Sequence, residues 1–159
     1  MQRMLCGGLR ESLLLPEKLR GLPKADKLEN TVRNILRERS GEVVSVVLFG
    51  SMAKDEWTIY SDFDLIVVVS RNGRRIIDRI LEYSAYVEGP VDLFVYSVDE
   101  VLKMFEDFNV LVLDALKDGV VLYDNGFWQG LRRRLNELVE GGVLTPERRG
   151  WAINPKRGS

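Results

Sequence analysis

The chain has 159 residues, of which 45% are hydrophobic and 30% are charged, and its formal net charge is −1. These values are typical of a single globular domain and exclude a disordered or fibrous protein, and no apolar run is long enough to span a bilayer. The near-zero net charge also argues against a protein that gathers long nucleic acid through its overall electrostatic field.

Hydrophobic spacing predicts helices and strands that alternate along the chain. Apolar residues recur at helical intervals in several segments, and runs rich in β-branched residues indicate strands. In chain order we predict a helix at 9–19 (interrupted by Pro16), a helix at 24–40, strands at 43–49 and 65–69, a helix at 74–87, a strand at 91–96, helices at 98–108 and 110–117, a strand at 120–124 and a helix at 127–139.

Local signals add detail to two of these helices. Ser97 and Glu100 have the spacing of a capping box, which predicts the start of the helix at 98–108. The helix at 74–87 has one apolar side. Its members are Ile76, Ile77, Ile80, Leu81 and Ala85.

These elements predict an α/β (α+β) fold in which a small mixed sheet carries helices packed on one face. Within a single globular unit we expect an N-terminal helical extension at 1–40 and a central unit at 41–140. We expect a loosely ordered C-terminal tail at 141–159, because the sequence there is rich in glycine and charge and lacks a helical pattern.

Two aspartates stand at the start of the second predicted strand, in the stretch SDFDLIVVV. Side chains alternate across a strand, so Asp62 and Asp64 project from one face while Phe63 and Leu65 project from the other. Two carboxylates held this close repel each other unless a cation or a proton lies between them. The pair therefore predicts a cation site.

The third predicted strand, VDLFVY, places Asp92 on the face opposite its apolar neighbours. If the second and third strands lie side by side, Asp92 joins Asp62 and Asp64 in a group of three carboxylates. Such a group suits two divalent ions that hold a nucleophile and a triphosphate for in-line displacement. The alternative is that Asp92 only caps the strand entry after Gly89-Pro90.

Histidine is absent from the sequence, and Cys6 is its only cysteine. This excludes a Ser-His-Asp triad, a CxxC zinc site and an imidazole base. A bound metal must therefore sit on oxygen ligands, which favours Mg²⁺, and a general base must be sought among the carboxylates.

Gly50 and Ser51 follow the first predicted strand and precede a segment, MAKDEW, that can open a helix. Glycine allows close approach of the backbone, the serine hydroxyl adds a donor, and free N–H groups at a helix start suit phosphate oxygens. Lys54 adds a positive charge. We therefore predict that Gly50, Ser51 and Lys54 bind the phosphates of a nucleotide.

Together these features resemble the DNA polymerase beta nucleotidyltransferase superfamily. The shared pattern is an apolar strand, Gly50-Ser51, ten intervening residues, Asp62-Phe63-Asp64 and a second apolar strand. The sequence FGSMAKDEW…SDFDLIVV is most similar to the minimal nucleotidyltransferases of prokaryotes, and the resemblance covers residues 43–96. It implies that the central unit is a nucleotidyltransferase domain in which Asp62, Asp64 and Asp92 are catalytic and ligate the metal.

The resemblance also implies a reaction and a partner. Two Mg²⁺ ions and ATP would serve transfer of AMP to a hydroxyl, with Asp92 helping to deprotonate or orient that hydroxyl. Members that this chain resembles often pair with a HEPN toxin, and the resemblance implies transfer to one of its tyrosines, which would make the chain an antitoxin. We expect a cytoplasmic protein without a membrane segment.

Two positions depart from the minimal family pattern. Met52 and Asp55 stand where members often have arginine and glycine, which removes one phosphate contact unless Lys54 replaces it. Three alternatives stay open. The first is an inactive nucleotide-binding antitoxin that neutralises its partner by binding. The second is a transferase acting on a small molecule such as an aminoglycoside or on a nucleic acid end, and the third is an adaptor that forms a homodimer.

Overall fold

The structure, a computed structural model, describes residues 15–70 and 73–157 and has the α/β class predicted from the sequence. Among these residues a mixed sheet contains four strands in the order β3-β2-β1-β4. They are β1 (Val43–Phe49), β2 (Phe63–Val69), β3 (Val91–Ser97) and β4 (Val120–Asp124). β1 is antiparallel to β2 and β4, whereas β2 and β3 are parallel, so the end of β1 and the starts of β2 and β3 lie at the same edge of the sheet.

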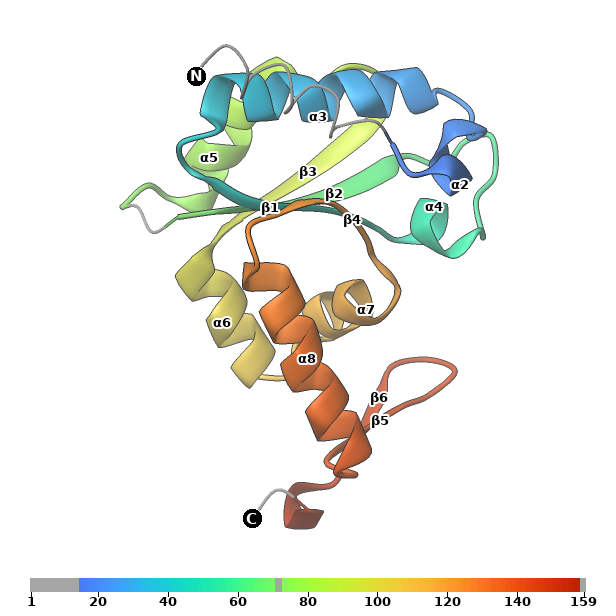
Figure 1. Ribbon diagram of the computed structural model, residues 1–159, viewed down its shortest axis with the longest axis vertical. Helices are drawn as coiled ribbons and strands as arrows, with labels where there is room; N and C mark the ends of the chain where they lie inside the picture. Colours follow the sequence, from blue (N-terminus) through green and yellow to red (C-terminus); the bar gives the residue numbers. More distant parts are fainter. Residues whose placement is uncertain (1–14, 71–72, 158–159) are drawn as a thin grey trace.

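Helices cover both faces of this sheet (Figure 1). One face carries α2 (Glu17–Arg20), α3 (Ala25–Arg39) and α5 (Ile76–Tyr83), and the other carries α6 (Val98–Glu106), α7 (Val110–Asp118) and α8 (Phe127–Glu140). The expectation of helices on one face was therefore wrong. Both faces of the central strands are apolar, and each needs a covering layer. No described helix combines the length and the apolar character needed to cross a membrane.

Two clusters of buried side chains lie on the two faces, and β2 supplies both. Phe63 and Leu65 pack with the α3 side, whereas Ile66 and Val68 pack with the α6, α7 and α8 side. Consecutive residues of a strand point to opposite faces, which explains this division. The continuous apolar run of β2 is therefore buried on both sides.

Most elements form close to the predicted positions. β1 and β4 have the predicted bounds, and β2 begins at Phe63, so Asp64 lies inside the strand. The helix predicted at 74–87 is divided into α5 and the short helix η1 (Ser84–Tyr86). The helix predicted at 9–19 falls mostly on residues 1–14, which lie outside the described residues, and Pro16 stands at the N-cap of α2.

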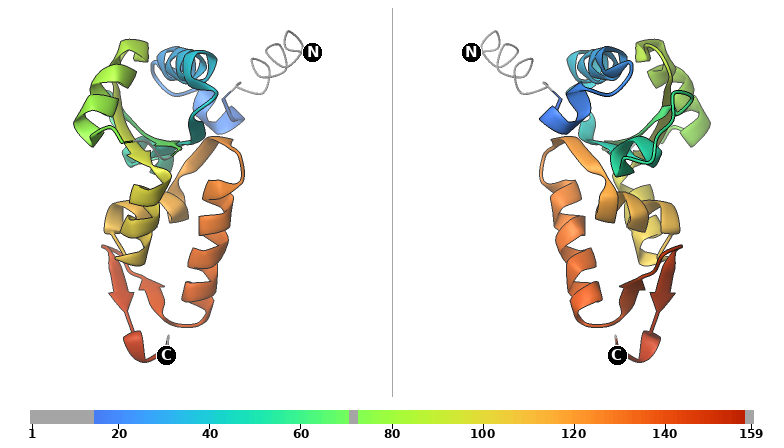
Figure 2. Two further views of the ribbon diagram at one scale, coloured as in Figure 1. Left: turned by 90° about the vertical axis from the view of Figure 1, so that its left-hand side faces the viewer. Right: turned by 90° about the vertical axis from the view of Figure 1, so that its right-hand side faces the viewer.

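The described part of the C-terminal tail differs from the expected loose order. β5 (Leu144–Pro146) and β6 (Trp151–Ile153) form an antiparallel hairpin, which η2 (Pro155–Arg157) follows. The Trp151 indole N–H donates to Asp114 Oδ1 of α7 at 2.8 Å, and Leu144 is fully buried. Figure 2 shows the hairpin beside the end of α8. Trp151 and Leu144 thus anchor the hairpin, although its local sequence has no strong strand pattern.

In α5 an arginine side chain is buried in the protein, whereas much of the apolar side of the helix is exposed to solvent. Arg79 is 1% exposed, whereas Ile77 and Leu81 are 51% and 64% exposed. The guanidinium donates from Nε to the Val95 carbonyl oxygen at 3.3 Å and from Nη1 to the Arg74 carbonyl oxygen at 2.5 Å. Ile76, Ile77 and Leu81 of the apolar side of this helix are therefore exposed to solvent, and the arginine is buried instead.

The Arg79 guanidinium also pairs with Glu100, which caps α6. The Ser97 N–H donates to Glu100 Oε1 at 2.8 Å and the Glu100 N–H donates to Ser97 Oγ at 3.3 Å, which is the predicted capping box. Burial raises the pKa of Glu100, but hydrogen bonds from Ser97 and Arg79 outweigh it and lower that pKa below its ordinary value. The stability that this carboxylate contributes is therefore full above its ordinary pKa and is lost as the pH falls further.

We expect Glu100→Ala to lower the free energy of unfolding by about 3 kcal/mol, because it removes the carboxylate partner of a buried guanidinium and a helix cap. Urea unfolding at neutral pH measures this change. Glu106→Ala, at an exposed position of the same helix, is the control and should cost less than about 0.5 kcal/mol. Equal effects of the two substitutions would contradict the role assigned to the Arg79 pair.

Candidate active site

The starts of β2 and β3 place two of the predicted aspartates side by side. Asp64 pairs with Asp92 in the parallel register, and directly paired residues on neighbouring strands point to the same face. The Phe63 N–H donates to the Pro90 carbonyl oxygen at 2.8 Å, which fixes the register where the strands begin. Asp92 therefore shares a face of the sheet with Asp64.

Asp62 directly precedes β2 and completes the acidic group, by which we mean Asp62, Asp64 and Asp92. Asp62 and Asp92 are exposed, whereas Asp64 is half-buried. Burial raises the pKa of Asp64, and the negative charges of Asp92 and then Asp62 raise it further. The three carboxylates are therefore close enough to influence one another electrostatically.

Aromatic neighbours account for the burial of Asp64. Phe49 at the end of β1 is its antiparallel partner, and the Phe49 ring meets the Phe94 ring edge to face with 5.2 Å between centroids. Phe94 follows Asp92 by two residues and so lies on the same face. The acidic group thus borders an aromatic surface, where the lower local dielectric strengthens electrostatic interactions.

Gly50 brings the backbone against the Asp64 carboxylate. Its φ of 77° and ψ of −159° lie in a region that essentially only glycine adopts. A Cβ at this position would lie 2.6 Å from Asp64 Oδ2. The next residue, Ser51, begins α4 (Ser51–Lys54), a single turn. The glycine–serine turn and the acidic group are therefore in contact, and phosphate binding by the turn stays a prediction.

The two departures from the family pattern have different structural meanings. Met52 is 4% exposed and packs in the core, so it provides no substitute for a phosphate-binding arginine. Asp55 follows α4 with φ 65°. This left-handed conformation favours glycine and is tolerated by aspartate, which explains a usual glycine there without any substrate contact.

The chemistry of the acidic group suits a divalent cation. Within residues 15–70 and 73–157, no ion pair or hydrogen bond joins these three carboxylates to another side chain. Across the same residues, no three acidic, histidine or cysteine side chains already stand together as a metal site. Metal binding by Asp62, Asp64 and Asp92 stays a prediction that the oxygen donors support.

A basic cavity of about 520 Å³ borders α4. Four cations and two acids from separate segments line it together with Ala53: Lys18, Lys54, Lys117, Arg148, Glu56 and Asp118. The Asp118 carboxylate lies 3.8 Å from Lys54 Nζ and 3.9 Å from Lys117 Nζ. The sequence singled out Lys54 alone, because nothing in local spacing shows that α2, α7 and the β5–β6 loop meet beside α4.

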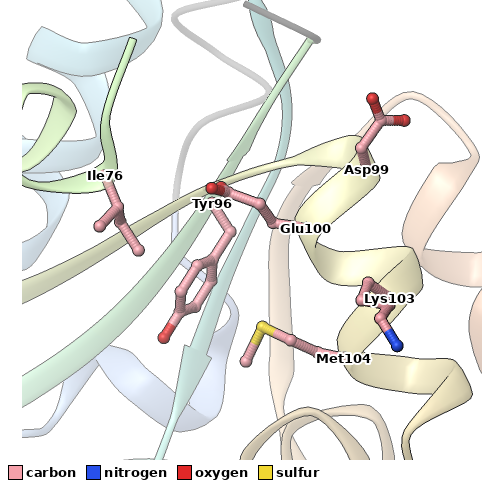
Figure 3. Close-up of a pocket in the computed structure, with 6 residues that line it drawn as sticks. All are labelled: Ile76, Tyr96, Asp99, Glu100, Lys103 and Met104. Carbon is pink, nitrogen blue, oxygen red and sulfur yellow. The ribbon is translucent and has the colours of Figure 1, made fainter. Parts of the chain in front are cut away.

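A more apolar hollow of about 400 Å³ lies elsewhere (Figure 3). Ile76 of α5 and Tyr96 of β3 line it with four residues of α6: Asp99, Glu100, Lys103 and Met104. Tyr96 follows Asp92 by four residues, which is about 13 Å along an extended strand. The hollow is therefore near the far end of β3 from the acidic group and is not part of the candidate site.

Comparison with known proteins places this geometry in a family. The profile of the nucleotidyltransferase domain matches residues 29–125, which include the acidic group and the glycine–serine turn. A protein of Methanocaldococcus jannaschii that is provisionally named a protein adenylyltransferase is 24% identical over 144 residues, and the alignment covers 79% of this chain and 91% of that protein. The predicted division at residues 40 and 140 stays a prediction.

Two solved structures have a similar course of the chain. One is a provisionally described nucleotidyltransferase from Sulfolobus solfataricus, with 22% identity and a TM-score of 0.44 over 67% of this chain and 93% of that chain. The other is a toxin–antitoxin structure with AMP-PNP, with 15% identity and a TM-score of 0.47 over 70% of this chain and 86% of that chain.

Proposed function

Because the chain belongs to the nucleotidyltransferase domain family, we propose that it transfers AMP from ATP to a hydroxyl group of a partner protein. The observation that carries this proposal is the pairing of Asp64 with Asp92, next to Asp62 and against the Gly50 backbone. Carboxylates beside a phosphate-binding turn are what metal-assisted nucleotidyl transfer needs. The name of the Methanocaldococcus relative supports a protein as the acceptor and an adenylyl group as the cargo.

The proposed roles follow from position. The Gly50–Ser51 turn donates hydrogen bonds to phosphate oxygens, Asp62 and Asp64 hold Mg²⁺, and Asp92 orients the acceptor hydroxyl and helps to remove its proton. Two bound Mg²⁺ ions would neutralise charge on the triphosphate. The acceptor oxygen attacks the α-phosphorus, the bond to the bridging oxygen breaks, and pyrophosphate leaves.

We further propose that the partner is a HEPN toxin, that the acceptor is one of its tyrosines, and that the chain acts as the antitoxin. The resemblance of FGSMAKDEW…SDFDLIVV to minimal nucleotidyltransferases supports this choice. A partner protein also suits a chain with a net charge of −1, which has no overall field to attract a long nucleic acid.

A second candidate function is an antitoxin that binds nucleotide and partner without transfer. Two observations favour it: Met52 is buried at the position of the usual arginine, and Lys54 is engaged by Asp118. Fewer free cations then remain to stabilise charge on the departing pyrophosphate. The two candidates differ in whether the partner becomes covalently modified.

Labelled ATP tests the proposal. The protein is incubated with Mg²⁺, the product of the neighbouring gene and ATP labelled at either the α- or the γ-phosphate. We expect label on the partner only from α-labelled ATP, and none after EDTA. Absence of label, with partner activity suppressed equally by wild type and by Asp64→Asn, would establish the binding-only function instead.

We expect the basic cavity to contribute to ATP binding through its cations. Lys117→Ala and Arg148→Ala should each weaken ATP binding about five-fold, which is about 1 kcal/mol for a partly exposed charge. Lys103→Ala, an exposed lysine of α6 beside the hollow of Figure 3, is the matched control and should leave the Kd unchanged. Titration of each variant with ATP and Mg²⁺ by calorimetry measures the effect. Unchanged Kd values in all three would remove the cavity from the site.

A further inference from the structure

Tyr60 is the one tyrosine of the chain whose side chain projects into solvent. It is 86% exposed, and the four others are partly or fully buried. The Tyr83 hydroxyl donates to Glu42 at 2.6 Å and the Tyr86 hydroxyl accepts from Arg39 at 2.9 Å. Among the described residues none bonds to the Tyr60 hydroxyl. The phenol is therefore available as a nucleophile.

A compact turn presents Tyr60 in this way. The Thr58 N–H donates to Ser61 Oγ at 2.9 Å, and the Ser61 N–H donates back to the Thr58 carbonyl oxygen at 3.0 Å. The Tyr60 N–H donates to Thr58 Oγ1 at 3.2 Å. The backbone is held by its own polar groups, so the aromatic ring stands outside the core while the turn keeps its position before β2.

The same turn brings Tyr60 to the acidic group. Tyr60 and Asp62 line one cavity of about 180 Å³, and Met52 from α4 lines it too. Residues two apart are separated by at most about 7 Å of backbone. Tyr60 therefore borders the same cavity as Asp62, which we assign to the metal, and as Met52 of α4, which follows the Gly50–Ser51 turn.

We propose that Tyr60 is an internal acceptor and that the enzyme adenylylates its own chain there. This inference rests on the proposed function. Tyr60 Oη attacks the α-phosphorus of ATP, the bond between that phosphorus and the oxygen bridging to the β-phosphorus breaks, and pyrophosphate leaves. The phenolic proton passes to a carboxylate of the acidic group and then to water. The product is a phosphodiester of tyrosine and adenosine at the entrance of the site, where it slows transfer to a separate acceptor.

The test follows the label to a residue. Wild type, Tyr60→Phe and Tyr96→Phe are each incubated with Mg²⁺ and α-labelled ATP, with and without the neighbouring gene product, and are then digested for mass spectrometry. We expect the peptide containing Tyr60 to gain the mass of one adenylyl group in wild type and in Tyr96→Phe. In Tyr60→Phe the label on the enzyme's own chain should fall at least about ten-fold, which corresponds to about 1.4 kcal/mol in the barrier to transfer. This variant should still label the partner.

The outcomes separate this inference from the proposed function. Label on the partner with none on residue 60 would overturn the inference and leave the function standing. No label on either protein would overturn both. Mixing Tyr60→Phe with Asp64→Asn tests transfer within one chain, because only the second variant then carries the acceptor. Label on the Asp64→Asn chain would contradict the intrachain step.

Discussion

Asp64→Asn is expected to reduce nucleotidyl transfer by at least about 10²–10³-fold while making the metal-free protein more stable. The loss of rate is the scale expected when a preorganised charge at a reacting phosphate is removed. The gain in stability follows from the electrostatics of the acidic group: burial and the charges of Asp92 and Asp62 raise the pKa of Asp64, so its ionised form is unfavourable in the folded state. Asparagine keeps the shape and removes the charge.

The same reasoning fixes a pH dependence. The folded chain binds the Asp64 proton more tightly than the unfolded chain, because the pKa of Asp64 is raised on folding. Raising the pH through the interval between the two pKa values therefore lowers the free energy of unfolding of the metal-free wild type.

Thermal unfolding with and without Mg²⁺, beside the transfer assay, measures both effects. A destabilisation of 1 kcal/mol corresponds to about 2–4 °C in a protein of this size. Mg²⁺ should raise the Tm of wild type and not that of Asp64→Asn. Asp107→Asn, which removes an exposed aspartate at the end of α6, is the control and should change neither rate nor Mg²⁺ response. A lower Tm for Asp64→Asn than for wild type would contradict the expectation that repulsion between these carboxylates destabilises the folded protein.

Gly50→Ala is expected to inactivate the enzyme by displacing Asp64. The added Cβ would meet Asp64 Oδ2 at 2.6 Å, and the φ of 77° already disfavours any side chain. The carboxylate or the turn must move, and a shift of about 1 Å in a catalytic group costs about 10²-fold in rate. Backbone strain should lower the free energy of unfolding by about 1–3 kcal/mol.

Gly130→Ala is the matched control for this substitution, and its expected effect on the free energy of unfolding has the opposite sign. Gly130 lies inside α8, and a Cβ there would only reach Arg133 Nη2 at 3.8 Å, an ordinary contact. Alanine in a helix interior is favoured over glycine by about 1 kcal/mol, so this variant should be active and more stable. Transfer assays and urea unfolding on both variants decide the matter. A fully active Gly50→Ala would show that the contact with Asp64 has no part in the site.

Local sequence predicted the secondary structure correctly wherever a pattern is compatible with a single element. The β-branched run of β1 could only be a buried strand, and Ser97 with Glu100 could only begin a helix, so both formed where they were predicted. The alternation along β2 likewise put Asp64 on the face opposite Phe63 and Leu65 before any neighbour was known. These features depend on spacing within a few residues, which the sequence states directly.

Side-chain burial on α5 shows where this guidance failed. Ile77 and Leu81 belong to the apolar side of this helix, yet they are exposed, and Arg79 is buried. The reason is that carbonyl oxygens of β3 and of the α5 entrance, together with Glu100, satisfy the guanidinium. Arg79 is buried because its hydrogen-bond and ion-pair partners come from three different segments. The hydrophobic pattern of one helix contains no information about those partners.

The sequence by itself showed which chemical groups were available: no histidine, one cysteine, a glycine–serine pair after a predicted strand, and aspartates at the starts of two predicted strands. Tertiary structure alone decided that Asp92 lies in register with Asp64, that Gly50 touches the same carboxylate, and that Lys18, Lys117 and Arg148 gather beside α4. The physical reason is the range of each effect. Alternation and backbone preference act between neighbours in the chain, whereas register, close approach and charge clustering arise only when packing brings distant segments together.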